Sequence, residues 1–179
     1  FVVPGAALSE VEKICADSDE SASVTQGARH VMFKVGSTML VSRRLEGEFL
    51  AYRQAIPRNN TIHVVGETRA LLSSIDRVSL IISDKLKSPL RCIFGDNVLS
   101  ITTKTGIGDA ADQCPIEGDG GGLEIGFNNR YLMDALKAAP AEKVRLELTS
   151  GVAPCVILPA EGEENFLYMV LPVRLKASE

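Results

Sequence analysis

The sequence contains no tryptophan, two histidines and four cysteines among its 179 residues. Cys15, Cys92, Cys114 and Cys155 are scattered without a Cys-x-x-Cys spacing, which argues against a zinc site or a disulfide framework. We expect reduced, partly buried thiols and a cytoplasmic protein. No apolar run approaches the roughly 18 residues of a membrane-spanning helix, and no signal peptide is visible, so we expect no membrane partner.

Side chains arranged for catalysis are also missing. His30 and His63 lie far apart in strand-like stretches, which favours neither catalysis nor metal binding. The segment 106–109 lacks the Lys-Ser/Thr pair of a phosphate-binding loop. The carboxylates at 161–164 surround a glycine and are typical of a solvated turn, although an enzyme that uses them is a weaker alternative. We therefore expect a non-enzyme with no catalytic residue, no metal and no cofactor.

The composition is that of an ordinary globular protein, with 45% hydrophobic and 23% charged residues. The chain is long enough for one sizeable domain, or for one and a half small ones. Its formal net charge is −4, so the chain as a whole does not attract nucleic acid. Any contact with nucleic acid would have to use a local basic face.

A pattern of about sixty residues occurs three times in the chain. The three copies open with apolar stretches at residues 1–4, 61–65 and 123–127. Apolar residues at helical spacing follow, and Leu8, Leu71 and Leu132 hold equivalent positions in the three predicted helices. Gly66 and Asn128 stand where a helix N-cap belongs, and Asn is a strong N-cap residue. Each copy therefore predicts a strand followed by a helix.

After each helix the apolar period changes from 3.6 to two, which predicts a meander of strands. Turns between these strands are predicted at Gly36-Ser37, at 95–97 and at Ser150-Gly151. The glycine-rich run 118–122 is typical of a mobile loop. The apolar stretch 166–171 predicts a last strand, buried or at a sheet edge, and strand pairing should not easily absorb the tail beyond Pro172.

Two such units side by side predict an α+β domain of roughly 120 residues, with antiparallel sheets and helices on one face. Residues 57–179 supply two units and hence one domain. Residues 1–56 supply only the second half of a preceding domain. The segment 56–60 has the composition of a linker between them.

On the first predicted helix, Leu8, Val11 and Ile14 should face the sheet. The outward positions of the three predicted helices carry both basic and acidic residues. The outward basic residues are Lys13, Arg69, Arg77, Arg130 and Lys137. Acidic residues stand close by, so surface ion pairs at helical spacing explain the mixture without any ligand. Alternatively, these basic side chains would contact DNA phosphates without reading bases.

Three stretches carry a resemblance to a known family. The first is Ser-Arg-Arg-Leu-Glu-Gly-Glu-Phe at 42–49, followed by Tyr52, Ile56 and Pro57. The second is Leu-Glu-Ile-Gly-Phe-Asn at 123–128 with Tyr-Leu-Met-Asp-Ala-Leu at 131–136, and the third is Tyr-Met-Val-Leu-Pro-Val-Arg-Leu at 168–175. Together they resemble the bacterial DNA polymerase III β sliding clamp, over essentially the whole chain through Leu175.

The resemblance implies the DNA clamp fold, which repeats β-α-β-β-β units six times in three domains. Two full-length chains would close head to tail as a homodimer around double-stranded DNA. Residues 1–56 would be the second half of the middle domain, and residues 57–179 the C-terminal domain. The helices would line the hole, with Lys13, Arg69, Arg77, Arg130 and Lys137 as candidates for sequence-independent phosphate contact. Leu80 and Ile81 would lie at the subunit contact, with ordinary core packing as the alternative.

Partner proteins of the family dock a short apolar peptide into a groove between the middle and C-terminal domains. The implied partners are the DNA polymerase III alpha subunit, the clamp loader and other proteins with a clamp-binding motif. An apolar trough with a few polar anchors suits the Leu or Phe side chains of such a peptide. The matching positions are Leu50, Gln54, Ala55, Asn128, Tyr131, Val152, Pro154, Met169, Leu171, Pro172, Val173, Arg174 and Leu175.

Two departures from the family affect these expectations. Part of the family's groove comes from a segment that would precede Phe1, which is not a natural start, so we expect an incomplete groove. The family usually ends at the position of Leu175, whereas this chain continues through residues 176–179, which would lie over the groove or be disordered. The rival function is a stand-alone peptide-binding or scaffolding module without any DNA encirclement.

Overall fold

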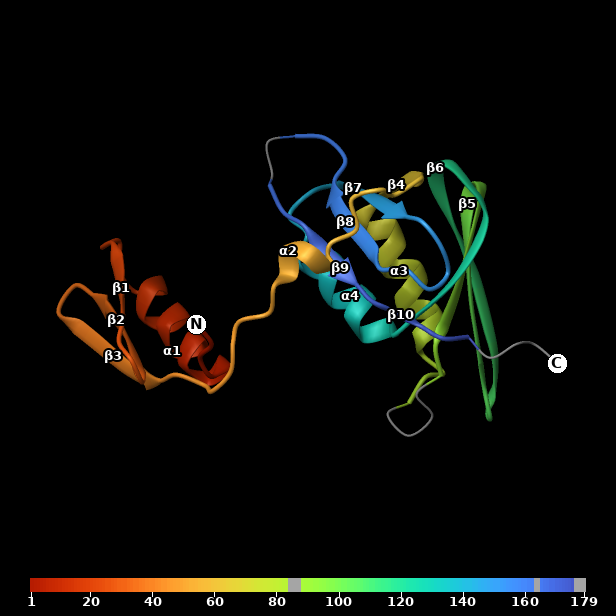
Figure 1. Ribbon diagram of the computed structural model, residues 1–179. Coiled ribbons are helices and arrows are strands. Elements are labelled where there is room, and N and C mark those ends of the chain that lie inside the picture. Colours follow the sequence, from red (N-terminus) through yellow and green to blue (C-terminus); the bar gives the residue numbers. More distant parts are fainter. Residues whose placement is uncertain (84–87, 163–164, 176–179) are drawn as a thin grey trace. The chain divides into compact units, whose positions relative to one another are not determined.

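A computed structural model describes residues 1–83, 88–162 and 165–175 (Figure 1). The chain divides into two compact units, Phe1–Tyr52 and Arg53–Glu179, each considered by itself below. The assignment of residues 1–56 and 57–179 to two clamp domains stays a prediction. The extension at 176–179 and part of the predicted acidic turn, Glu163 and Glu164, lie outside the described residues. Among the described residues, no helix has the length and apolar character needed to span a membrane.

The first unit contains one helix and a three-stranded antiparallel sheet. Its elements are α1 (Gly5–Ala16), β1 (Ala22–Gln26), β2 (His30–Val35) and β3 (Thr38–Arg43), and the strand order is β1-β2-β3. On β2, Val31, Phe33 and Val35 are buried at alternate positions, as in a strand with one covered face. The predicted turn at Gly36-Ser37 is confirmed, because Val35 pairs with Thr38 across it.

Two expectations for the first unit are wrong. Residues 1–4 form no strand: the Val2 carbonyl accepts a hydrogen bond from the Leu45 N–H at 2.8 Å, while the Pro4 carbonyl accepts from Ala7 and Leu8 in the first turn of the helix. Pro4 has no N–H to give to a ladder and instead precedes α1 directly. Leu8 was expected to face the sheet, but its side chain is 49% exposed, whereas Val11 and Ile14 are half-buried.

The second unit is built on a seven-stranded antiparallel arrangement with the order β10-β6-β4-β7-β8-β9, in which β5 also pairs with β6. The short helix α2 (Tyr52–Ala55) stands at the division between the two units. The other elements are β4 (Ile62–Glu67), α3 (Thr68–Ser79), β5 (Leu90–Thr105), β6 (Gly108–Phe127), α4 (Asn129–Ala138), β7 (Lys143–Leu148), β8 (Cys155–Pro159), β9 (Tyr168–Val170) and β10 (Pro172–Val173). The predicted α+β class with antiparallel sheets is confirmed.

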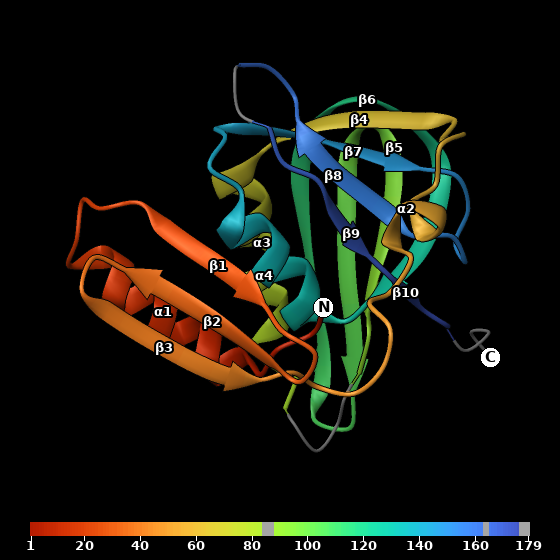
Figure 2. The same ribbon diagram turned by 60° about the vertical axis from the view of Figure 1, so that its left-hand side comes forward.

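Helices α3 and α4 lie side by side and share one core with the strands (Figure 2). Leu71, Ile75 and Val78 of α3 are buried, and so are Leu132 and Leu136 of α4. These positions repeat every three or four residues, so each helix turns one apolar stripe inward. Burying each such side chain stabilises the fold by about 1.5–3 kcal/mol.

The two predicted helix N-caps have different outcomes. Asn128 caps α4, since its side-chain oxygen accepts a hydrogen bond from the backbone N–H of Arg130 at 3.0 Å. Gly66 does not cap α3, because it belongs to β4 and the helix begins at Thr68. A Cβ at Gly66 would lie 3.0 Å from Cδ1 of Leu71, so glycine serves close packing there.

The long β5–β6 hairpin overturns two further expectations. The predicted turn at 95–97 lies inside β5, and the predicted mobile loop at 118–122 lies inside β6. The two segments face each other where the pairing register shifts on both sides of Asp96. Asn97 has a positive φ of 55°, and its side-chain oxygen accepts from the Gly118 N–H at 3.1 Å. Turn-forming residues here build a β-bulge, which bends both strands without ending them.

The end of the chain is more fully paired than predicted. β9 pairs with β8 through Cys155 and Val170, as an edge strand should. After Leu171, β10 pairs with β6, with Val173 opposite Gly126. The expectation that strand pairing would not absorb the tail beyond Pro172 is therefore wrong for Val173, because the chain changes partner strand at Leu171.

Gly120→Ala should destabilise the second unit by about 1–3 kcal/mol, because overpacking a bulge forces backbone shifts. An added Cβ would collide with Cβ and the carbonyl oxygen of Phe94. Urea denaturation followed by circular dichroism measures the change. Gly106→Ala is the matched control, since a Cβ there meets nothing within 4 Å. Equal midpoints for the two variants would contradict the role of Gly120.

Candidate functional site

Most of the predicted groove positions of the second unit gather around the C-terminal end of β6. Asn128 follows this strand directly, and Tyr131 stands one turn into α4. Val173 pairs with Gly126 of β6. Val152 belongs to the turn between β7 and β8, and Met169 to β9. Residues far apart in the sequence thus meet at one end of one strand.

Two glycines make this gathering sterically possible. A Cβ at Gly126 would collide with the Val173 carbonyl oxygen and lie 2.8 Å from Cδ2 of Leu175. A Cβ at Gly151 would collide with the carbonyl oxygen of Glu124. The C-terminal stretch and the β7–β8 turn therefore both lie against the same short part of β6, and a side chain at either glycine would push one of them away.

Strand register places the remaining groove positions at the same end. Cys155 pairs with Val170, so the next residues along the two chains are Pro154 and Leu171. On the other side, Pro172 pairs with Phe127, so Leu171 also comes next to Asn128. The chain thus pairs with β8 up to Val170 and with β6 from Pro172, and this change of partner strand places Leu171 between Pro154 and Asn128.

The gathered side chains form a surface that is apolar and open. Tyr131, Val152 and Leu171 are 63%, 77% and 61% exposed. Pro154, Met169, Pro172 and Leu175 are half-buried and lie lower in the surface. Contiguous exposed apolar side chains of this kind mark interaction sites in soluble proteins. Among the described residues of the second unit, Tyr131, Val152 and Leu171 lie outside the hydrophobic core.

A pocket of about 460 Å³ adjoins this surface. Its lining includes Asn128, Tyr131 and Val173, three of the predicted groove residues, together with Ile82 and Pro89. The lining combines these apolar side chains with polar ones, including the amides of Asn128 and Asn129, so it could hold an apolar side chain of a peptide and anchor the peptide backbone.

The remaining four predicted groove residues are all exposed. Leu50 belongs to the first unit, where its side chain is 70% exposed. Gln54 and Ala55 are exposed residues of α2, and Arg174 is exposed beyond β10. Their place in a groove stays a prediction.

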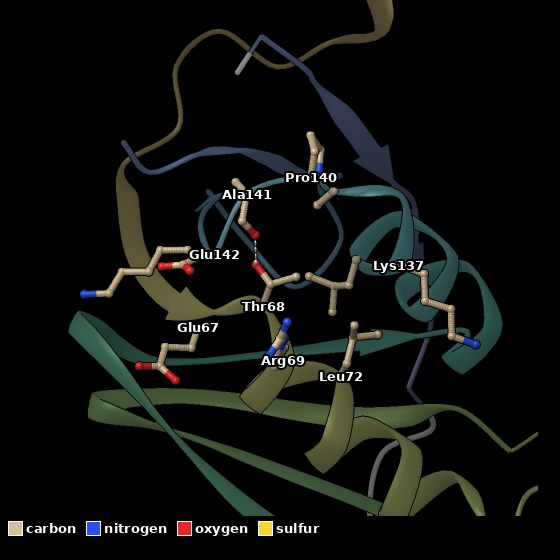
Figure 3. A pocket seen from close by; sticks show the side chains of 11 residues that line it. Glu67, Thr68, Arg69, Leu72, Lys137, Pro140, Ala141 and Glu142 are labelled. Atoms are coloured by element: carbon tan, nitrogen blue, oxygen red, sulfur yellow. Dashed lines mark hydrogen bonds between the residues drawn. The ribbon is translucent and has the colours of Figure 1, made fainter. Parts of the chain in front are cut away.

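Two of the predicted DNA-facing residues, Arg69 and Lys137, line one pocket of about 470 Å³ (Figure 3). Arg69 lies in the first turn of α3 and Lys137 in the last turn of α4, and the two helices contact each other. Glu67 and Glu142 line the same pocket, so its charge is mixed. Within this lining, the Thr68 hydroxyl donates a hydrogen bond to the Ala141 carbonyl at 2.7 Å.

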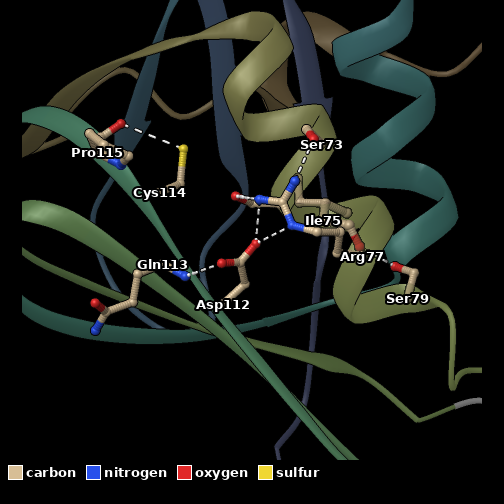
Figure 4. A network of polar contacts seen from close by, with 9 residues as sticks. Ser73, Ile75, Arg77, Ser79, Asp112, Gln113, Cys114 and Pro115 are labelled. Atoms are coloured by element: carbon tan, nitrogen blue, oxygen red, sulfur yellow. Dashed lines mark hydrogen bonds and ion pairs between the residues drawn. The ribbon is translucent and has the colours of Figure 1, made fainter.

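Arg77 is held inside the protein's own polar network (Figure 4). Its Nε donates to Asp112 Oδ2 at 2.8 Å, and its Nη2 lies 2.6 Å from the same oxygen. Nη1 donates to the Ser73 hydroxyl at 2.6 Å and Nη2 to that of Ser74 at 3.1 Å. The Gln113 N–H, and after it Arg77, hold the pKa of the Asp112 carboxyl below its usual value. A phosphate would have to compete with this network for the guanidinium.

The other predicted functional residues have simpler surroundings. Lys13 pairs with Glu10 at 2.7 Å on α1, and this hydrogen bond raises the pKa of the ammonium group. Arg130 is exposed in the first turn of α4. Leu80 follows α3 and is 79% exposed, which argues against core packing for it, while Ile81 is half-buried. Their DNA and subunit contacts stay predictions.

Sequence reasoning missed the supporting residues of both regions. Asp112 stands 35 positions from Arg77, and no local pattern connects them. Gly126 lies in the quoted 123–128 stretch and Gly151 in a predicted turn, yet their steric role needs the neighbouring strand to be known. Among the described residues, no three His, Cys, Asp or Glu side chains are grouped so that they could hold a metal ion.

Comparison with known proteins identifies the family. The model of the DNA polymerase III beta subunit, C-terminal domain, matches residues 53–174. The chain belongs to the DNA polymerase III β-subunit family. The Beta sliding clamp of Staphylococcus aureus is 31% identical over 175 residues, which are 97% of this chain and 46% of that protein. The chain thus spans about half the length of the curated relatives it matches.

Solved β-subunit structures agree with the fold. A putative DNA polymerase III beta subunit from Eubacterium rectale has a TM-score of 0.85 at 33% identity, covering 96% of this chain and 46% of that one. The sliding clamp from Pseudomonas aeruginosa bound to griselimycin has a TM-score of 0.87 at 26% identity, covering 97% and 47%. The resemblance to the β sliding clamp is therefore confirmed at the level of family and fold.

Asp112→Asn should lower the melting temperature at neutral pH and have less effect in acid. Because the folded-state pKa lies below the ordinary value of 3.8, the ionised carboxylate stabilises the fold above that pH. This stabilisation is lost as the pH falls through the folded-state pKa, where wild-type Asp112 is neutral too. Scanning calorimetry from neutral pH to below about pH 3 should show that the difference in melting temperature between the wild type and the variant becomes smaller.

Asp109→Asn is the control for this experiment, since Asp109 pairs with Lys104 at 3.8 Å on the same hairpin and both side chains are largely exposed. Its effect should be small at every pH. If the melting temperature of Asp112→Asn stayed below that of the wild type by the same amount at every pH, the carboxylate charge would not stabilise the network.

Proposed function

We propose that this chain forms the partner-docking part of a non-catalytic DNA sliding clamp of the bacterial replicase. The observation that carries the proposal is the open apolar surface around the end of β6, formed by Tyr131, Val152 and Leu171 in a chain of the β-subunit family. Its partners would be the DNA polymerase III alpha subunit, the clamp loader and other proteins with a clamp-binding motif.

Docking would use the surface as a receptor for a short apolar peptide. Leu or Phe side chains of the peptide would cover Tyr131, Val152 and Leu171, and so remove apolar area from water. The Asn128 amide and the pocket beside it would fix the peptide backbone. Such a surface needs no reaction chemistry, which fits an accessory subunit.

Retention on DNA would be topological and sequence-independent. The net charge of −4 and the mixed charges around Arg69 and Lys137 give weak electrostatic attraction to phosphates. A homodimeric ring of full-length chains, with Leu80 and Ile81 at the subunit contact, would hold DNA without tight binding. Arg69 and Lys137, which form no ion pair within the part of the chain that the structure describes, would then touch the backbone only transiently.

The second candidate is a stand-alone peptide-binding scaffold. Its supporting observation is that Arg77 and Lys13 are already paired with Asp112 and Glu10, so these helix positions are occupied without DNA. Both candidates use the same apolar surface, and retention on DNA discriminates between them.

Tyr131→Ala and Leu175→Ala in the full-length protein should each weaken a clamp-binding peptide by about tenfold, or about 1.4 kcal/mol. The first substitution removes exposed ring surface, and the second removes packing on Gly126. Titration calorimetry measures the affinity. Ile107→Ala is the control, because Ile107 is 73% exposed at the tip of the β5–β6 hairpin. If both variants bound the peptide as tightly as the wild type, the proposal that the peptide binds at this surface would be contradicted.

Full-length protein loaded by its clamp loader should stay on circular duplex DNA and leave after the circle is linearised. A closed ring around DNA can leave a circle only by opening, whereas it slides off a free end. Gel filtration of labelled protein with either DNA form measures retention. Equal loss from both forms would argue against encirclement and favour the scaffold.

A further inference from the structure

The first unit has a pocket that none of the assignments above explains. It has a volume of about 710 Å³. Its lining is Ala28, Arg29, Arg43, Arg44, Leu45, Glu46 and Gly47. We propose that this pocket binds carboxylates of an acidic segment, interleaved with apolar residues, of a protein partner. The pocket lies within Phe1–Tyr52 and its lining contains none of the predicted groove residues, so it goes beyond the proposed function.

The sheet brings the three arginines together from distant parts of the sequence. Arg29 lies in the turn between β1 and β2, and Arg43 ends β3. Arg43 pairs with His30 across the β2–β3 ladder. The Arg44 N–H then donates to the Arg29 carbonyl at 2.9 Å, which continues the pairing past the end of the strand. The relative positions of these residues are therefore set by backbone hydrogen bonds.

Arg44 is a fixed part of the pocket. Its Nη1 donates to the carbonyl oxygens of Gly27 at 3.2 Å and Ala28 at 3.1 Å, which ties the guanidinium to the β1–β2 turn. Its Nε is buried and has no acceptor among the described residues. An unsatisfied buried donor is uncommon in folded proteins, so this group calls for an explanation.

Arg29 and Arg43 are exposed, and within residues 1–83, 88–162 and 165–175 neither forms an ion pair. Other basic residues differ, since Lys143 pairs with Glu117 at 2.6 Å and Arg145 donates to Glu147 at 3.1 Å. Glu46 is the one carboxylate in the pocket lining. Three guanidinium groups against one carboxylate leave an excess of positive charge, which an oxyanion ligand would balance.

The neighbouring side chains favour an acidic peptide over a nucleic acid. Leu45 lines the pocket and is 47% exposed. The same loop continues to Phe49, which is 61% exposed. Phe49 also makes an edge contact with the Tyr52 ring, with centroids 6.1 Å apart. A phosphate backbone has no apolar groups to cover these side chains, whereas a peptide that alternates Asp or Glu with Leu has both.

The test uses the full chain and two labelled probes, a short peptide of alternating Asp and Leu and its counterpart of alternating Asn and Leu. Fluorescence anisotropy at low ionic strength should show about tenfold tighter binding of the Asp peptide. The preference should shrink at about 0.5 M NaCl because salt screens exposed charges. Equal affinity for the two peptides would overturn the proposal.

Arg29→Gln with Arg43→Gln should remove the preference for the Asp peptide and leave the Asn peptide unchanged. Both side chains are exposed and form no ion pair with the residues that the structure describes, so the double variant should keep the melting temperature of the wild type. Lys34→Gln is the matched control, because it removes one exposed positive charge from β2 outside the pocket. A loss of preference in this control would assign the effect to overall charge and overturn the site.

Two further measurements separate this site from its rivals. A duplex oligonucleotide should not compete with the Asp peptide, and full competition would assign the pocket to nucleic acid instead. Tyr131→Ala should leave the preference for Asp over Asn unchanged. If that variant abolished the preference, the acidic peptide would bind at the proposed groove, and the arginine pocket would be rejected while the groove stood.

Discussion

The second unit depends on the path of β6, a strand of 20 residues that pairs with β4, β5 and β10. One strand can serve three partners only if it bends, and the bend lies where its glycines face Asp96 and Asn97 of β5. Gly120 leaves room for the Phe94 backbone at this point. Below the bend Glu117 pairs with Val65, and beyond it the strand turns toward β10.

The same strand carries the candidate docking surface, so fold and site share one constraint. Gly126 lets the C-terminal stretch lie on β6, and Gly151 lets the β7–β8 turn approach it. Asn128 then ends the strand and starts α4, which places Tyr131 at the rim. Tyr131, Val152 and Leu171 lie outside the hydrophobic core, so their side chains stay open to solvent. A displaced β6 would therefore disperse the surface as well as the core.

Local patterns in the sequence predict those features that local physics decides. The Asn128 cap, the apolar stripes of α3 and α4, and the turn at Gly36-Ser37 depend on neighbours a few residues away, and the structure confirms them. The segment 95–97 has the same residue types as a turn, and only its distant partner strand makes it a bulge. The docking surface came from resemblance to a family, because exposure at Leu171 follows from a change of partner strand that no periodicity shows.

Charge availability is the property that the sequence reveals least. The sequence alone does not distinguish Arg77 from Arg43. In the structure, Arg77 forms an ion pair with Asp112 of β6, whereas Arg43 lines a pocket together with two further arginines. A cation already paired with a carboxylate contributes little to a partner, since binding must first break that pair. By this criterion the pocket of the first unit, lined by three arginines and one glutamate, carries an unbalanced positive charge, whereas the pocket that contains Arg69 and Lys137 also contains Glu67 and Glu142.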